Sequence, residues 1–207
     1  MKKFLYSTAA AAAAVAFAGC MEMKGVWYND FLDQRPVIFA EVMQLKASDR
    51  VYTANNLWIN EGRLSCENKI NNTSFIPAGT EIFPISASVD GIVFSDASGR
   101  TWELDFRAGK VQMAVEDYIR QTFTVLPPEV FMADMPPESL AAVRNGTVVP
   151  GMTREEVIVA CGLPSPLRTP ALTNQTWIYP TTEDGVSLRV IFRGDKVRRA
   201  ETMIEGE

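Results

Sequence analysis

The spacing of hydrophobic residues changes along the chain, and the change predicts two kinds of structure. Between residues 37 and 106, short hydrophobic runs alternate with clusters of turn-forming residues, which is the pattern of β-strands. The clearest run is 101–106, where Trp102, Leu104 and Phe106 alternate with two acidic residues. This run predicts a half-buried strand within a β-rich region.

The β-rich region contains several such runs, which begin with 37–42 and continue through 51–59, 63–70, 81–87, 91–95 and 101–106. The sequence Ile-Pro-Ala-Gly-Thr at 76–80 predicts a turn in which Gly79 takes a positive φ. Five or six short strands at this spacing predict a small barrel or roll. The strand number and this turn resemble those of bacterial SH3-like envelope modules, and the resemblance implies an SH3-like barrel.

A helical period replaces the strand pattern at 111–123, where Val115, Tyr118, Ile119 and Phe123 fall on one face. This spacing predicts a helix that faces the core, with a partner-binding helix as the alternative. The paired prolines at 127–128 and 136–137 then exclude a persistent helix or a central strand between them. We therefore expect a β-rich domain over 36–125, a proline-rich linker over 126–136 and a second domain over 137–207.

The second domain begins with two short helices. The first is predicted over 137–145, with Leu140 and Val143 facing inward and Asn145-Gly146 as its end. The second begins after Thr153, which is a good N-cap, and Glu156 completes a capping box.

The face and the end of this second helix also follow from the sequence. Val157, Ile158 and Cys161 share its apolar face. Gly162 is expected to close it in the left-handed conformation, and Pro164 prevents continuation.

Three hydrophobic runs separated by turn residues follow, at 176–179, 186–192 and 196–202. They predict an antiparallel three-stranded meander that the two helices cover on one face. The expected fold class is thus α+β, with a small β-barrel or roll followed by an ααβββ domain.

Composition excludes several kinds of chemistry. The 207 residues include no histidine, which removes Ser-His-Asp and Cys-His catalysis and histidine-ligated zinc. The net charge is −5 without a basic run, so no attraction to nucleic acid is expected. The adjacent carboxylates at 116–117 and 155–156 would point about 100° apart on a helix, so they do not converge. We expect no catalytic residue, no metal site and no cofactor.

The N-terminus resembles a bacterial lipoprotein signal. Two lysines precede an alanine-rich apolar run that is too short to span a bilayer, and the run ends Phe17-Ala18-Gly19-Cys20. The resemblance implies a signal peptide over 1–19, lipid attachment at Cys20 and a linker over 20–35. Met21 in place of an aspartate implies sorting to the outer membrane, on its periplasmic side. The alternative is an ordinary cleaved signal peptide.

The motifs of the last third resemble the SmpA/OmlA family of outer-membrane lipoproteins, which includes the E subunit of the β-barrel assembly machinery. The residues that carry the resemblance occur in the family's order: Gly151, Met152, Thr153, Glu156, Val157, Gly162, Pro164, Trp177 and Tyr179. They match structural positions, and we expect Trp177 and Tyr179 in the core rather than in an exposed contact patch. The family fold is the same ααβββ unit.

Three functions remain open from the sequence. The first is a non-enzymatic accessory lipoprotein that binds envelope proteins through the C-terminal sheet or its edge, and the family resemblance implies the β-barrel assembly machinery as the partner. The second is a cell-wall or small-ligand binding protein with a groove lined by residues such as Trp58 and Trp102, although we expect both in the core. The third is a protein inhibitor that shares the ααβββ fold. Neither the oligomeric state nor the partner follows from the sequence.

Cys66 and Cys161 admit two interpretations. In an oxidising periplasm they could form a disulfide between the two domains. Cys161 is also a core-facing helix position, where a free thiol packs as a small hydrophobic group. We expect two unpaired thiols.

Overall fold

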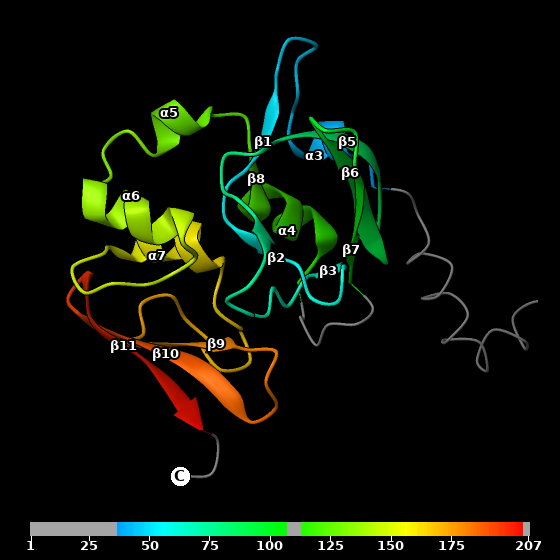
Figure 1. Ribbon diagram of the computed structural model, residues 1–207. Coiled ribbons are helices and arrows are strands. Elements are labelled where there is room, and N and C mark those ends of the chain that lie inside the picture. Colours follow the sequence, from blue (N-terminus) through cyan, green and yellow to red (C-terminus); the bar gives the residue numbers. More distant parts are fainter. Residues whose placement is uncertain (1–36, 107–112, 205–207) are drawn as a thin grey trace, which may run out of the picture. The chain divides into compact units, whose positions relative to one another are not determined.

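The structure is a computed structural model that describes residues 37–106 and 113–204 (Figure 1). The predicted signal peptide, the lipid-attachment residue Cys20 and the linker over 20–35 lie outside the described residues. Five helices and two main sheets make up this part of the chain, together with one two-stranded pair.

The first sheet has six strands in the order β3-β7-β6-β5-β1-β8. Their bounds are Leu64–Ser65 for β3, Thr101–Asp105 for β7, Gly91–Asp96 for β6, Glu81–Ser88 for β5, Val51–Thr53 for β1 and Phe123–Thr124 for β8. All neighbours are antiparallel except β3 and β7, which run parallel. The sheet curls, but its two edge strands do not pair within the described residues, so of the predicted barrel or roll a closed barrel is not formed.

Every second side chain along the strands points to the concave side of this sheet and forms its hydrophobic core. Trp102 and Leu104 on β7 point inward, as predicted, and Phe94 on β6 lies opposite Trp102. The helix α4, Val115–Thr122, packs against the same cluster through residues that include Tyr118 and Ile119. The core-facing interpretation of this helix is confirmed.

The first predicted strand is instead a helix. Phe39–Val42 forms the one-turn helix α3, and of the run 37–42 only Val37 makes a β-bridge, to Ala87. The helical turn directs the buried Phe39 ring edge-on against Phe123, with 5.3 Å between the ring centroids. Hydrophobic runs of this length do not separate helix from strand, and the tertiary contact decides.

Two further runs are shorter or broken in the structure. The run 51–59 is divided by residues 54–56 into β1 and β2, Leu57–Trp58, which pairs with β4, Phe75–Ile76. Of the run 63–70 only β3 is a strand. The turn at 76–80 forms as predicted, since Gly79 has φ +83° and the Thr80 amide donates to the Pro77 carbonyl at 3.2 Å.

The stretch between the paired prolines is not free of helix. Pro128–Phe131 forms the one-turn helix α5, with Pro128 in its first turn, where its missing N–H costs nothing. The helix α6, Pro137–Arg144, follows as predicted. Ala142 and Val143 face its core, whereas the predicted inward residue Leu140 is only half-buried.

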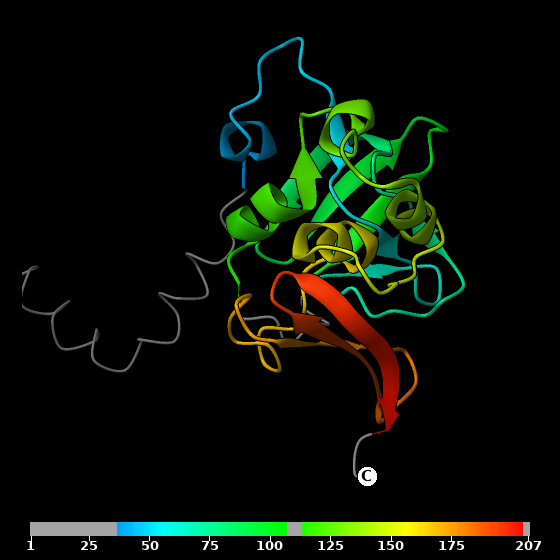
Figure 2. The same ribbon diagram turned by 90° about the vertical axis from the view of Figure 1, so that its left-hand side faces the viewer.

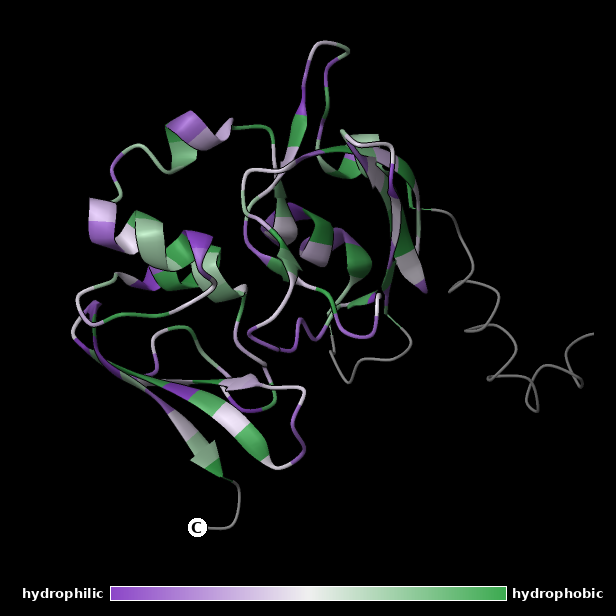
Figure 3. Cartoon of the chain, viewed as in Figure 1, coloured by the Kyte–Doolittle hydropathy of each residue, from purple (hydrophilic) through white to green (hydrophobic). Residues whose placement is uncertain are grey.

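The second sheet is the predicted antiparallel meander, in the order β11-β10-β9. Its strands are β9, Thr176–Pro180, β10, Val186–Arg193, and β11, Lys196–Ile204. The helices α6 and α7, Arg154–Cys161, cover one of its faces (Figures 1 and 2). Hydrophobic and polar residues alternate over the first half of β10 (Figure 3), and its residues Val190 and Phe192 belong to the same buried cluster as these helices.

The fold has one hydrophobic cluster inside the six-stranded sheet and a second cluster between the three-stranded sheet and the helices α6 and α7. Residues of the β-rich region extend into the second cluster. Trp58 and Ile70 belong to the second cluster although they precede its helices by many residues. The described residues of both regions therefore belong to one compact unit.

Buried asparagines connect the β-rich region to the carboxyl ends of α6 and α7. The amide of Asn56 donates to the carbonyls of Val143 at 2.8 Å and Ala160 at 3.0 Å, and that of Asn68 donates to Cys161 at 3.1 Å. The last carbonyls of a helix have no partner within the helix. The β-rich region supplies these partners, which fixes its position relative to both helices.

Candidate functional site

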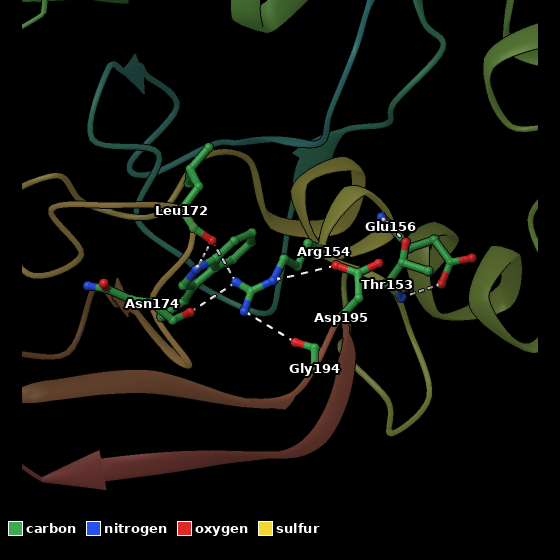
Figure 4. A network of polar contacts seen from close by, with 8 residues as sticks. Thr153, Arg154, Glu156, Leu172, Asn174, Gly194 and Asp195 are labelled. Atoms are coloured by element: carbon green, nitrogen blue, oxygen red, sulfur yellow. Dashed lines mark hydrogen bonds and ion pairs between the residues drawn. The ribbon is translucent and has the colours of Figure 1, made fainter.

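The capping box at the start of α7 is present as predicted and reaches one helix further. The Glu156 amide donates to Thr153 Oγ1 at 3.2 Å, and the Thr153 amide donates to Glu156 Oε2 at 2.8 Å (Figure 4). The hydroxyl of Ser139 on α6 also donates to Glu156 Oε2, at 2.9 Å. Glu156 is therefore occupied in positioning the two helices and is not an exposed acid or base.

Most of the remaining motif residues lie inside the fold, whereas Gly151 is exposed. Met152, Val157 and Trp177 are fully buried, and Tyr179, which is 1% exposed, donates its hydroxyl to the Gly162 carbonyl at 3.1 Å. The expectation that Trp177 and Tyr179 belong to the core is confirmed.

The glycine after α7 differs from the prediction. Gly162 has φ +79° and ψ −170°, which is not the left-handed helical conformation, because the chain leaves the helix extended. A Cβ at this position would lie 2.6 Å from the Asn68 amide nitrogen. Glycine is needed here for backbone conformation and for close approach, whereas Gly151, at φ +95°, has open space around it.

Arg154 holds three segments together, and sequence reasoning assigned it no role. Its guanidinium donates to the carbonyls of Leu172 at 2.6 Å and Asn174 at 2.9 Å, and it lies 3.5 Å from Asp195 (Figure 4). It also sits over the Phe192 ring, 4.2 Å from the centroid. The only local sign of such a role in the sequence is that Arg154 places a positive charge in the first turn of a helix, where the helix dipole disfavours a cation. These contacts fix the β10–β11 turn on α7.

Two of the carboxylates that the sequence places in adjacent pairs make structural contacts in the described part of the chain. Asp117 pairs with Arg120 at 2.9 Å on the same helix, and Glu156 serves the capping box. Within 37–106 and 113–204, no three Cys, Asp or Glu side chains come together as a metal site. Cys66 and Cys161 are both buried and unpaired.

A cavity of about 420 Å³ lies between the β-rich region and the segment after α7. Its wall includes Asn55, Cys66, Asn68, Tyr118, Gly162 and Pro164. Burial raises the pKa of the Cys66 thiol to about 11 and raises that of the Tyr118 hydroxyl, so both stay protonated at neutral pH. Neither of these two groups is therefore a ready nucleophile.

The aromatic groove considered from the sequence is not formed. Trp58 is fully buried and packs against Phe75, with 4.8 Å between the ring centroids. Trp102 is 6% exposed and donates its indole N–H to Asp96 at 2.8 Å. Neither side chain lines the cavity.

The outer edge of β11 is the second candidate surface. In the described structure β11 pairs with β10 along its length, and on its other side only Lys196 is bridged, to Thr153. Residues 189–201 of this hairpin carry five basic and two acidic side chains, a surplus of three positive charges in a chain of net charge −5. An open strand edge with a positive surface is a ready site for an extended partner.

Comparisons with protein-family models, with curated proteins and with solved structures found no match to this chain. Within the described residues, no helix has the length and apolar composition that crossing a membrane requires. The chain's own motifs and the two candidate surfaces are therefore what indicates its function.

Proposed function

We propose that this protein is a non-enzymatic accessory lipoprotein of the outer membrane, related to the SmpA/OmlA family. It is anchored through Cys20, faces the periplasm and binds an envelope protein during outer-membrane assembly. The signal-like N-terminus and the order of motifs between Gly151 and Tyr179 support the family and the anchor. The observation that carries the binding function is the open, positively charged edge of β11.

The fold suits a binding surface because the sheet behind that edge is held rigidly. The helices α6 and α7 cover its inner face, and Arg154 fixes the β10–β11 turn through Asp195 and two loop carbonyls. Asn56 and Asn68 then tie both helices to the β-rich region. A preorganised surface loses little conformational entropy on binding, which favours affinity.

The anchor is tested by labelling cells with a radioactive fatty acid. The intact protein should incorporate the label and fractionate with the outer membrane, and Cys20→Ala should do neither. An unlabelled, soluble intact protein would contradict the anchor.

The binding function is tested by in-cell photocrosslinking. A photoreactive amino acid at Ile204, which is 56% exposed at the end of β11, should crosslink to components of the outer-membrane assembly machinery. The matched control is the same amino acid at Ser98, an exposed turn position of the β-rich region. Absence of envelope-protein adducts at Ile204 and at other exposed positions would contradict the proposed function.

The cavity supports a second candidate function, the binding of a small envelope ligand. Its volume of about 420 Å³ lies within the range of about 300–1,000 Å³ that small-molecule sites occupy. On this proposal the curled sheet is an SH3-like relative that binds a cell-wall fragment where it meets α7. Native mass spectrometry with soluble peptidoglycan fragments tests it. We expect a complex with the intact protein and none with Leu163→Trp, whose larger side chain would fill the cavity. Absence of any complex would refute this second function.

A further inference from the structure

The register of the second sheet determines which backbone groups of β11 point away from β10. The Phe192 amide donates to the Gln175 carbonyl at 2.7 Å, so Phe192 directs its backbone groups toward the β9 side. Val197 lies opposite Phe192 and bonds outward, to the Gly151 amide and the Met152 carbonyl, at 2.8 Å each. The pair of Phe192 and Val197 thus shows which backbone groups point away from β10 at the start of β11.

The same register gives the rest of the strand. Backbone direction repeats every second residue, so the amide and carbonyl of Val190 point toward β9, as those of Phe192 do. The backbone groups of Ala200, which lies opposite Val190, therefore point away from β10. By the same alternation, the backbone groups of Thr202 and Ile204 also point away from β10. Thr202 lies opposite Leu188, and Ile204 lies opposite Val186. The extra residue of the β-bulge is Arg198, between Val197 and the inward-bonding Arg199.

These outward groups have no partner in the described structure. No backbone or side-chain group of residues 37–106 or 113–204 bonds to the amides of Ala200, Thr202 or Ile204. The opposite edge of the sheet is covered, since Thr169 Oγ1 accepts from the Ile178 amide and the Pro180 carbonyl accepts from the Ile70 amide, both at 3.0 Å. The fold protects one edge and leaves the other available.

The available edge has a hollow and an unbalanced charge. The hollow has a volume of about 280 Å³ and is lined by Val148, Pro150, Ile191, Arg198, Arg199 and Ala200. Glu201 lies 3.0 Å from Arg199 and also accepts hydrogen bonds from Arg189. Arg193, Lys196 and Arg198 are exposed and make no ion pair with a described residue. The positive charge beside the edge is therefore left for a ligand.

We propose that an extended acidic segment of a partner protein adds to β11 as a fourth strand, beside residues 200–204. Its backbone bonds the outward groups of Ala200 and Thr202, its carboxylates lie near Arg198, and one apolar side chain enters the hollow. This inference rests on the proposed envelope-binding function and names the chemistry of the partner.

The test uses the full chain, isotopically labelled, and a short capped peptide that alternates glutamate with valine. Binding should slow hydrogen exchange at the amides of Ala200, Thr202 and Ile204 by at least about tenfold, as strand pairing does. The matched control peptide is N-methylated at alternate residues, so that it keeps its charge but cannot donate on one edge. Equal binding of both peptides would overturn strand addition, since charge alone would then suffice.

Two variants test the edge and the charge separately. Thr202→Pro removes an outward N–H that takes no part in the ladder with β10, whereas the matched variant Thr202→Val keeps it. Thr202→Pro should weaken peptide binding at least about tenfold, or 1.4 kcal/mol, and Thr202→Val should not. Arg198→Glu should weaken binding by a similar factor with an unchanged thermal midpoint, which keeps the proposal testable if the proline variant fails to fold.

Other outcomes separate this inference from the proposed function. Protection of the same amides by phosphatidylglycerol vesicles, with no response to the peptide, would overturn it in favour of a lipid surface. Concentration-dependent protection without peptide would overturn it in favour of a second copy. Envelope-protein crosslinks at surfaces other than β11 would overturn the strand addition and leave the proposed function standing. Absence of crosslinks at every position would remove both.

Discussion

Asn56 is the side chain whose loss should weaken the fold most for its size. It is fully buried, and its amide donates to the carbonyls of Val143 at 2.8 Å and Ala160 at 3.0 Å. Its Oδ1 accepts from the Ala78 amide at 2.8 Å. Asn56→Ala leaves the Ala160 carbonyl and the Ala78 amide without this partner, whereas the Val143 carbonyl keeps the Gly146 amide at 3.0 Å.

The expected loss follows from the number of groups. Each group without a partner costs about 1–3 kcal/mol, so two imply about 2–6 kcal/mol. Water that enters the vacated space recovers part of this, and we expect a loss near 3 kcal/mol. For a chain of this size that corresponds to a fall of roughly 6–12 °C in the thermal midpoint.

The measurement is urea unfolding of the intact protein, followed by circular dichroism and by tryptophan fluorescence. The matched control is Asn174→Ala, an exposed asparagine whose side chain bonds no described residue, which should change the free energy of unfolding by less than about 0.5 kcal/mol. If Asn56→Ala costs less than about 1 kcal/mol, the asparagine connection does not hold the β-rich region to α6 and α7.

Three further predictions concern the helix α7 and its surroundings. Thr153→Ala, which removes the capping box, should lower the free energy of unfolding by about 1 kcal/mol, and exposed Thr173→Ala should not. Gly162→Ala should be more destabilising than Gly185→Ala in urea unfolding, because both have a positive φ but only Gly162 faces Asn68; equal losses would exclude the close contact. Burial raises the pKa of the Cys161 thiol from 9.0 to about 12. Unfolding therefore releases a proton from this thiol above pH 9, so its contribution to stability should be constant below pH 9 and should be lost as the pH rises toward 12. Cys161→Ala should make this fall shallower in urea titrations at increasing pH, and an unchanged slope would contradict the shift.

Features that depend on neighbours in the sequence could be predicted from it. The capping box of α7 needs only Thr153 and Glu156, three residues apart, and both of its hydrogen bonds are present. The strands of the second sheet were predicted because hydrophobic alternation and tight turns are local properties. The burial of Trp177 and Tyr179 follows from the same alternation.

Features that depend on distant partners could not be predicted. The run 37–42 reads as a strand, yet Phe39 joins a helix because it packs against Phe123. The asparagines gave no signal, since Asn68 bonds Cys161 across 93 residues of sequence. Arg154 was likewise unremarked because its partners come from two separate turns.

The elements of the C-terminal sheet and the charge of its last hairpin follow from the amino-acid sequence alone. Which edge of that sheet is covered depends instead on contacts between distant segments. Ile70 and Thr169 reach the outer side of β9 from such segments, while β11 is bridged on its outer side only at Lys196 within the described residues. A strand's pattern specifies its two faces through its side chains, but the pairing of its edges depends on backbone groups that every sequence shares.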